Sequence, residues 1–289
     1  MVYNQVEVAK MQFQCSSKLR TIMLTQVILY NQLKEKVDFF VKKLSFNKLV
    51  NKIGRKLALS LTNILSLSLF KHLGQITTKK KLWEIMNPRC SYKTLVVNIN
   101  RFYTLGLLIL SLILKSNCKN SHLVKHIDST DIPVSCNRKA KYHQVMKQLA
   151  TWGKTGKGWF YGLKLHLISD LKGKLLSLKF TSGNVDDRTV VINLSKNLEG
   201  IFLADAGYVS EKLAQAFYQE NKRILIAKPK ANMKKLATMA EIYLHRTRMR
   251  IEINFRNLKY FWGLITSLPR SVAGYLANYT YSLLAYCLR

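Results

Sequence analysis

Two kinds of hydrophobic pattern follow one another along the chain. In the first 119 residues, apolar positions recur at helical spacing over 25–49, 57–73 and 95–114. Residues three and four apart lie on one face of a helix, so these stretches predict helices with a buried side. Pro88 lies between two of them, where a helix is expected to end. We therefore predict a helical N-terminal domain over residues 1–119.

After the polar stretch 115–121, the pattern changes to alternating apolar and polar residues, which is typical of strands with one buried face. It predicts strands at 123–129, 160–168, 174–180, 201–204 and 223–227. Helices are expected from Asp186 or Asp187 to Leu198, from Ser210 to Asn221, and around Glu252. We predict a mixed α/β domain over 120–289, with a mixed five-stranded sheet flanked by helices.

The charge of the chain indicates its class of partner. There are 47 Lys and Arg against 15 Asp and Glu, a formal net charge of +32, and 48% of the residues are hydrophobic. That apolar content suffices for a folded core, and a basic excess spread over a globular chain favours a polyanion, most often nucleic acid. Ribosomal and membrane-surface proteins share this composition, so charge says nothing about a reaction.

Cysteines and apolar runs bear on the compartment. The five cysteines are far apart and odd in number, which predicts reduced thiols rather than a disulfide framework or a zinc site. The N-terminal residues lack the layout of a secretory signal. The longest apolar run, Leu105 to Leu114, is well short of the roughly 20 residues that cross a bilayer. We expect a cytoplasmic protein with no membrane partner.

One segment near the C-terminus combines a polar and an apolar face. Its polar residues have spacings that place them on one face of a single helix: His245, Arg248, Glu252 and Lys259. An apolar stripe accompanies them: Ile251, Phe255, Leu258 and Trp262. A carboxylate held between cations suggests metal-assisted phosphate chemistry. The alternative is an ordinary surface ion pair between Arg248 and Glu252.

Two further acids stand at the ends of predicted strands. Asp128 ends the first strand and Asp205 ends the fourth. In a ribonuclease-H-like topology these strands are neighbours, which would bring the two carboxylates together, and Glu252 could close the cluster from its helix. Three carboxylates repel one another unless a divalent ion binds them, and oxygen ligands favour Mg²⁺.

These residues lie in a pattern that resembles the DDE transposases of bacterial insertion sequences, most closely the insertion-sequence nine-eight-two group. The resemblance covers most of the chain. Four stretches carry it: 127–130, 162–168, 204–208 and the helix of Glu252. The family motif Tyr-x2-Arg-x3-Glu-x6-Lys matches at Arg248, Glu252 and Lys259, with His245 in place of the tyrosine. Asp131 also departs from the pattern, because relatives often have an apolar residue or proline there.

The resemblance implies a metal-binding catalytic triad of Asp128, Asp205 and Glu252, with two Mg²⁺ ions, for which Mn²⁺ can substitute. It implies that His245, Arg248 and Lys259 bind DNA, that the partners are double-stranded transposon ends and target DNA, and that the protein works as a homo-oligomer. The N-terminal domain would recognise the ends. Two alternatives stay open: a decayed DNA-binding protein without chemistry, and a nuclease of the same fold without strand transfer.

Other polar residues have simpler interpretations. We expect Asp131 to be a turn residue beyond the first strand if Pro133 ends that strand. Asp186 and Asp187 precede a helix whose free N–H groups attract acids, which favours capping over catalysis. The histidines at 143 and 166 have no second ligand at metal-binding spacing, so packed or DNA-facing rings are expected.

The segment from Trp152 to Tyr161 mixes glycines, lysines and aromatic residues. It fits a DNA-contacting loop and equally a basic hairpin whose aromatic rings pack on the sheet. Its glycines form neither a dinucleotide-binding fingerprint nor a phosphate-binding loop, so we expect no nucleotide cofactor.

Overall fold

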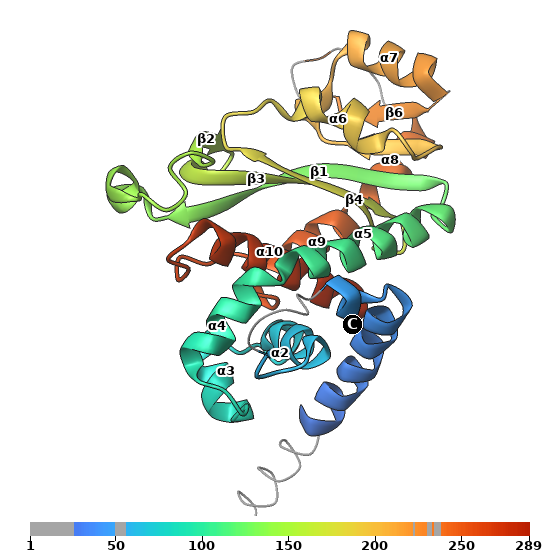
Figure 1. The fold of residues 1–289 in the computed structure, drawn as a ribbon. Coiled ribbons are helices and arrows are strands. Elements are labelled where there is room, and N and C mark those ends of the chain that lie inside the picture. Colours follow the sequence, from blue (N-terminus) through green and yellow to red (C-terminus); the bar gives the residue numbers. More distant parts are fainter. Residues whose placement is uncertain (1–25, 50–55, 222, 230–232, 234–237) are drawn as a thin grey trace, which may run out of the picture. The chain divides into compact units, whose positions relative to one another are not determined.

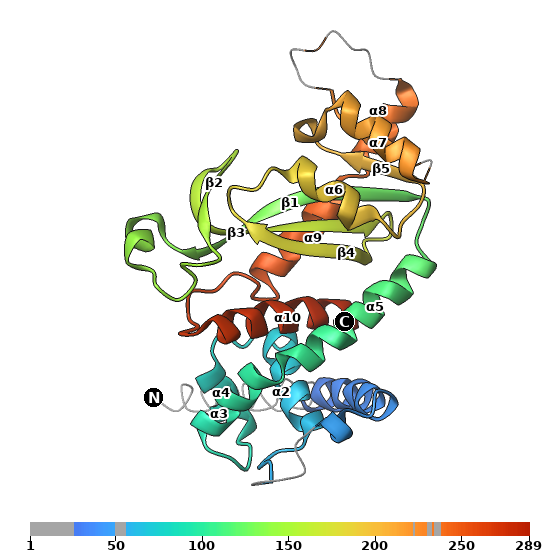
Figure 2. The ribbon, with the colours of Figure 1, turned by 45° about the horizontal axis from the view of Figure 1, so that its top comes forward.

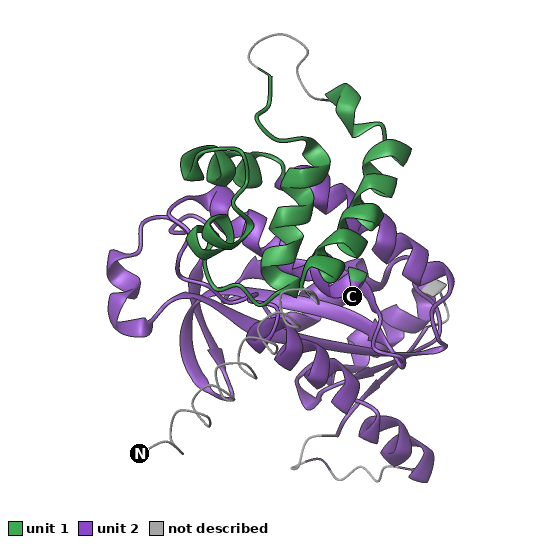
Figure 3. Cartoon of the chain, turned by 90° about the horizontal axis from the view of Figure 1, so that it is seen from below, with its two compact units in different colours: residues 1–102, 288 green, residues 103–287, 289 purple. Residues whose placement is uncertain are grey.

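The computed structural model describes residues 26–49, 56–221, 223–229, 233 and 238–289. The chain forms two compact units, residues 1–102 with Leu288 and residues 103–287 with Arg289 (Figure 3). Residues 1–25, for which a reduced Cys15 and no secretory signal are predicted, lie outside the described residues. The four described cysteines are free, as expected of reduced thiols.

Helices are the regular structure of the first unit's described residues, and short non-helical segments connect them. It contains a helix over 26–43, the 3₁₀ helix η1 (Phe46–Leu49), and the helices α2 (Leu61–Leu73), α3 (Lys79–Met86) and α4 (Tyr92–Arg101). Ser60, Thr78 and Ser91 precede α2, α3 and α4, and each side chain accepts a hydrogen bond from a backbone N–H of the first turn. The helical character predicted for this part of the chain is confirmed.

The second unit is built on a six-stranded mixed sheet, in the order β2-β3-β1-β5-β6 with β4 also paired to β3. Its strands are β1 (Val124–Ser135), β2 (Thr151–Thr155), β3 (Gly158–Asp170), β4 (Leu175–Ser182), β5 (Ile201–Ala204) and β6 (Ile224–Ala227). β1 pairs antiparallel with β3 and parallel with β5, and β5 pairs parallel with β6. The predicted mixed α/β fold, with the first and fourth predicted strands adjacent, is therefore confirmed.

Helices cover both faces of this sheet (Figures 1 and 2). They are α5 (Tyr103–Lys119), α6 (Asp187–Ser195), α7 (Glu211–Asn221), α8 (Met239–Arg246), α9 (Met249–Tyr260) and α10 (Val272–Leu288), with 3₁₀ helices η2 (Asn137–Tyr142) and η3 (Ala206–Tyr208). Val191 and Leu194 of α6 and Phe217 of α7 form one core with Ile127 and Phe202 of the sheet. On the other face, Tyr279 of α10 stacks on Phe180 of β4 with ring centroids 5.2 Å apart.

The prediction of five strands is wrong because β2 was not expected. For the segment from Trp152 to Tyr161 the sequence leaves a loop and a basic hairpin open, and the structure has the hairpin, in which Gly153 of β2 lies opposite Phe160 of β3. A Cβ at Gly153 would lie 2.3 Å from the carbonyl oxygen of Gly183, so the strand can approach that loop only through a glycine. Because this contact with Gly183 requires a glycine, the sequence of β2 lacks the regular apolar and polar alternation from which a strand is predicted.

The first strand is also longer than predicted. β1 continues past Asp128 to Ser135, so Asp128 lies inside the strand instead of at its end, and Asp131 faces Lys164 of β3 instead of forming a turn. β5 pairs only with Val124 to His126, which leaves the rest of that edge of β1 without a partner strand among the described residues. Pro133 is tolerated there because an open edge requires no backbone N–H donor.

The predicted single helix of 245–262 is divided into α8 and α9. At the break the backbone tightens: the N–H of Thr247 donates to Leu244 and the N–H of Arg248 to His245, as in a 3₁₀ turn. The Thr247 hydroxyl lies 2.8 Å from Nε2 of the buried His126 ring in β1. His245 therefore belongs to α8, and it does not share a helix with Arg248, Glu252 and Lys259.

Helix α5 groups with the sheet, although the sequence places the domain boundary after it, at 119/120. The Asn117 side chain donates to the carbonyl of Leu175 (2.9 Å), and the Cys118 thiol donates to that of Leu176 (3.3 Å). Among the described helices, none alone has the length and apolar character to span a membrane. Only α4 and α5 taken together, as a bent pair, satisfy that test.

Candidate active site

The sheet brings two of the predicted acids to one cation. Asp128 lies in β1, and Asp205 directly follows β5, the parallel neighbour of β1. Arg248, at the start of α9, donates from one guanidinium nitrogen to Oδ2 of Asp128 and from the other to Oδ1 of Asp205, both at 3.2 Å. Residues that are 43 and 120 positions from Arg248 in sequence thus share its charge.

Asp128 is the more perturbed of the two acids. Burial raises the pKa of its carboxyl to about 6, although the Arg248 charge and the hydrogen bond from the Ser129 amide (2.8 Å) favour the ionised form. The negative charges of Asp205 and Asp187 raise this pKa further. The Asp128 side chain is 22% exposed and that of Asp205 is 54% exposed, so the second acid is largely hydrated.

Glu252 stands apart from this pair. It lies in the first turn of α9, its side chain is exposed, and it has no hydrogen bond or ion pair among the described residues. Over the same part of the chain, no three His, Cys, Asp or Glu side chains are grouped so as to hold a metal ion. The alternative of an Arg248–Glu252 ion pair is not observed either, because Arg248 contacts Asp128 and Asp205.

Two of the three predicted acids, Asp128 and Asp205, place carboxylate oxygens where they could bind a hard divalent cation. Carboxylate oxygens of Asp128 and Asp205 already converge on a positive group, and such oxygens are the ligands that Mg²⁺ prefers. A single guanidinium between two carboxylates marks a place where positive charge is stabilised. Mg²⁺ is commonly bound by one or two carboxylates together with water and phosphate oxygens, and Glu252, one helical turn beyond Arg248, is the third predicted acid.

Lys259 is held by an acid that sequence analysis assigned to a turn. Its Nζ lies 2.9 Å from Oδ1 of Asp131, and the two side chains are only 10% and 21% exposed. Burial lowers the pKa of Lys259, and the Asp131 contact partly offsets that effect. The sequence contains one signal for the Asp131–Lys259 pair, which is that Asp131 stands where relatives often have an apolar residue or proline.

His245, the third predicted DNA-binding residue, is enclosed. Both of its ring nitrogens are buried and have no hydrogen-bond partner among the described residues. Burial lowers its pKa, and the nearby Arg248 charge lowers it further. A neutral ring beside the Arg248 guanidinium contributes no positive charge of its own.

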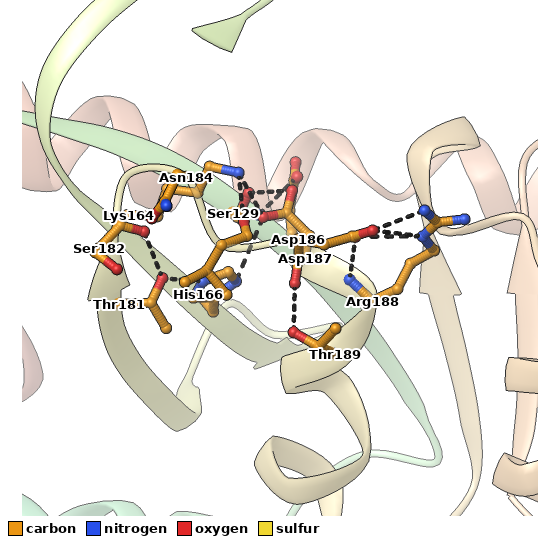
Figure 4. A network of polar contacts seen from close by, with 12 residues as sticks. Ser129, Lys164, His166, Thr181, Ser182, Asn184, Asp186, Asp187, Arg188 and Thr189 are labelled. Atoms are coloured by element: carbon orange, nitrogen blue, oxygen red, sulfur yellow. Dashed lines mark hydrogen bonds and ion pairs between the residues drawn. The ribbon is translucent and has the colours of Figure 1, made fainter. Parts of the chain in front are cut away.

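Asp187 takes part in a network that sequence analysis missed (Figure 4). It accepts hydrogen bonds from the Ser129 hydroxyl (2.7 Å) and from Lys164 Nζ (3.1 Å), while Nδ1 of His166 lies 3.8 Å away. His166 also contacts the Thr181 hydroxyl at 2.8 Å, so it is packed within the sheet as expected. Asp187 thus joins α6 to the residue that follows Asp128.

Asp186 performs the predicted capping role instead. Its carboxylate accepts the backbone N–H of Arg188 at 2.9 Å and also pairs with the Arg188 guanidinium. These contacts lower the pKa of Asp186. Asp186 therefore caps α6 at the surface, whereas the adjacent Asp187 faces Ser129 of the sheet.

A family model described as "Transposase DDE domain" matches residues 118–271. The chain is similar to a solved structure, "Crystal structure of the Mos1 mariner paired end complex with Mn", at 10% identity, covering 88% of this chain and 85% of that one, with a TM-score of 0.26. It is also similar to "Mos1 transposase paired-end complex with left transposon end", at 10% identity, with coverages of 83% and 81% and a TM-score of 0.24. No curated protein matches.

Proposed function

The chain belongs to the family of transposases with a DDE domain, and from that premise we propose that Asp128, Asp205 and Glu252 are its three catalytic acids. It is a DNA transposase, an enzyme that cleaves and joins DNA. The matched region, residues 118–271, contains all three acids. The observation that carries the proposal is the shared guanidinium, because Asp128 and Asp205 come from distant parts of the chain and meet at one positive group.

DDE transposases use divalent metal ions, and we propose that this protein binds two Mg²⁺ ions, for which Mn²⁺ can substitute. Bound ions of this kind activate a water or a DNA 3′-hydroxyl and neutralise the leaving oxygen in an in-line phosphoryl transfer. Asp128 and Asp205 would hold them. The exposed Glu252 side chain is free to turn toward these acids from the first turn of α9.

Arg248 has a second task in this proposal. Its guanidinium makes two charge-assisted hydrogen bonds to the acids, and the planar group suits bidentate contact with a phosphate equally well. If Asp128 and Asp205 held metal ions, Arg248 would be available to contact the DNA backbone. Lys259 would contact DNA only after leaving Asp131, and His245 would support Arg248 by packing beside it.

The remaining expectations are part of the same proposal. Residues 1–119 would recognise the transposon ends, and a homo-oligomer of the protein would pair them. The insertion-sequence nine-eight-two group and a cytoplasmic, nucleoid-associated location in bacteria are proposed on the resemblance stated above. The net charge of +32 supports double-stranded DNA as the partner.

The test is metal-dependent cleavage of a DNA fragment that carries the element's own ends. Wild-type protein should nick this fragment with Mg²⁺ and should produce strand-transfer products with a target plasmid. Asp128→Asn, Asp205→Asn and Glu252→Gln should each abolish both products. Asp186→Asn is the matched control, because it changes an exposed acid that caps α6 and touches none of the three.

Each other outcome has a defined meaning. Cleavage without strand transfer would identify a nuclease of the same fold. A wild-type protein that binds ends but is as inert as Asp205→Asn would identify a decayed binding protein. Full activity of Asp205→Asn would refute the proposed site.

A further inference from the structure

The β2–β3 hairpin presents an aromatic and cationic face to solvent. Cross-strand pairing places Trp152 opposite Tyr161 and Lys154 opposite Trp159, so these four side chains lie on one face of the two-stranded ribbon. Trp152 is 44% exposed and Trp159 is 59% exposed, whereas Tyr161 is buried. Lys154 Nζ lies 5.7 Å from the centroid of the Trp159 ring. Two indoles and a lysine thus form a ladder, which we call the tryptophan face.

The opposite face of the hairpin is fixed to the protein. Gly153 approaches Gly183 too closely to admit a side chain, and the Thr151 hydroxyl contacts Oδ1 of Asn184 at 3.0 Å and accepts its backbone N–H at 3.1 Å. Asn137 holds the other strand by donating to the carbonyl of Trp159 at 2.8 Å. The exposed rings are therefore carried on a ribbon that is supported from its other face, and the Trp152 ring also packs against Tyr161, with ring centroids 5.6 Å apart.

The surrounding sequence has only positive charge. Between Asp131 and Asp170 there is no acidic residue, while seven basic residues occur: Arg138, Lys139, Lys141, Lys147, Lys154, Lys157 and Lys164. Of these, Lys164 is the one paired with an acid, Asp187. Lys141 lies 4.8 Å from the ring centroid of Tyr142, which is 69% exposed. Figure 2 shows β2 and the adjoining part of β3 at one end of the sheet, beyond β4.

This end of the sheet is continuous with the catalytic strand. Asp131 lies three residues after Asp128 in β1, and its partner Lys259 feels the charge of Lys157 at the hairpin turn, which contributes to lowering the Lys259 pKa. A strand of DNA that reaches Asp128 along β1 would pass the hairpin.

We propose that the tryptophan face binds a DNA strand with unpaired bases beside the active site, with Trp152 and Trp159 stacking on bases and Lys154 contacting phosphate. Exposed indoles cannot stack on the bases of an intact duplex, because those bases are already stacked on one another. Aromatic rings beside cations are the arrangement that binds single strands without sequence preference. The inference rests on the proposed function and adds to it a contact for DNA that is opened at the cleavage point.

The experiment measures DNA binding by the full chain in EDTA, so that no cleavage occurs. Fluorescence anisotropy with a labelled oligothymidine of about 20 nucleotides is compared with a duplex of the same length. Trp159→Ala and Trp152→Ala should each weaken single-strand binding by between about 5- and 150-fold, the range for loss of one stacked base, and should change duplex affinity less than about twofold. Trp159→Tyr should restore most of the lost affinity.

Two controls separate stacking from other effects. Tyr218→Ala removes another exposed aromatic ring, on α7, and should leave both affinities unchanged. Circular dichroism melting of each variant establishes that it is folded. Lys154→Ala should weaken single-strand binding and reduce its salt dependence, because it removes one phosphate contact.

The inference is overturned if both tryptophan variants bind the single strand as wild type does, or if they lose duplex and single-strand affinity equally. Either result leaves the catalytic proposal intact, because that proposal depends on cleavage by wild type and its loss in Asp205→Asn.

Discussion

Asp128 should make the stability of the metal-free protein depend on pH in a direction unusual for an aspartate. Its pKa is raised from 3.8 to about 6, with burial as the largest cause. The folded protein therefore holds a proton, between pH about 4 and 6, that the unfolded chain has released. The free energy of unfolding falls as the pH rises through this window. About two pKa units, at about 1.4 kcal/mol each, correspond to a loss of about 3 kcal/mol above pH 6.

Replacement by asparagine isolates this contribution. Asp128→Asn preserves the shape of the side chain but cannot ionise, so its unfolding free energy should lack the decline of about 3 kcal/mol between pH 4 and 7. The assay is urea unfolding in EDTA at half-unit steps of pH, comparing slopes rather than absolute values. The comparison of slopes removes the constant effect of leaving Arg248 with one acid fewer.

Asp186→Asn provides the control with the opposite sign. The pKa of Asp186 is lowered, mainly by its hydrogen bonds with Arg188. Its contribution to the free energy of unfolding is therefore fully present above the pKa of the unfolded chain and is lost only as the pH falls below about 4. The Asp186→Asn curve should therefore run parallel to wild type from pH 5 to 7. If the wild-type and Asp128→Asn curves are also parallel from pH 4 to 7, the carboxyl of Asp128 is not desolvated and the reasoning is refuted.

Three further predictions use the same structure. Arg248→Ala leaves Asp128 and Asp205 facing each other without a cation, so thermal unfolding without metal should show that the free energy of unfolding falls by about 1 to 3 kcal/mol. Saturating Mn²⁺ should stabilise this variant more than it stabilises wild type, and equal stabilisation would contradict the prediction. Gly153→Ala should lower stability by about 1 to 3 kcal/mol because its Cβ meets the Gly183 backbone, whereas Gly156→Ala, with open space around it, should not; equal melting temperatures would contradict the close approach. Mn²⁺ affinity, measured by electron paramagnetic resonance, should fall about tenfold per pH unit below pH 6, as Asp128 takes up a proton; a flat profile would show that this carboxyl is not a ligand.

The parts of the fold that could be predicted are those in which local pattern and burial agree. The short strand Ile201–Ala204 is apolar throughout and is followed at once by Asp205, so both the strand and the position of the acid could be inferred. The Ser210 cap of α7 is equally local, because its hydroxyl accepts the N–H of Leu213. The adjacency of β1 and β5 followed from topology once the fold was inferred.

The parts that could not be predicted depend on contacts between distant residues. Pro133 can remain inside β1 only because β5 is too short to reach it, and nothing near Pro133 in sequence encodes that length. The break before α9 contains neither glycine nor proline, and it lies where Thr247 meets His126, 121 residues away. The choice between Asp186 and Asp187 as the cap depends on Ser129, because its hydroxyl holds the second acid.

The predicted DNA-binding cations share one property that links catalysis to binding. Arg248 is paired with Asp128 and Asp205, and Lys259 is paired with Asp131, so neither charge is freely available in the absence of DNA and metal. In the proposed site, Asp128 and Asp205 would hold a metal ion with the same oxygens that now accept from Arg248, so the guanidinium would be released and could bind phosphate. Thermodynamic linkage requires a reverse effect of equal size, so under this proposal DNA that engages Arg248 would strengthen metal binding. The acids of this site would thus be fully exposed to metal only when a phosphodiester is present to react.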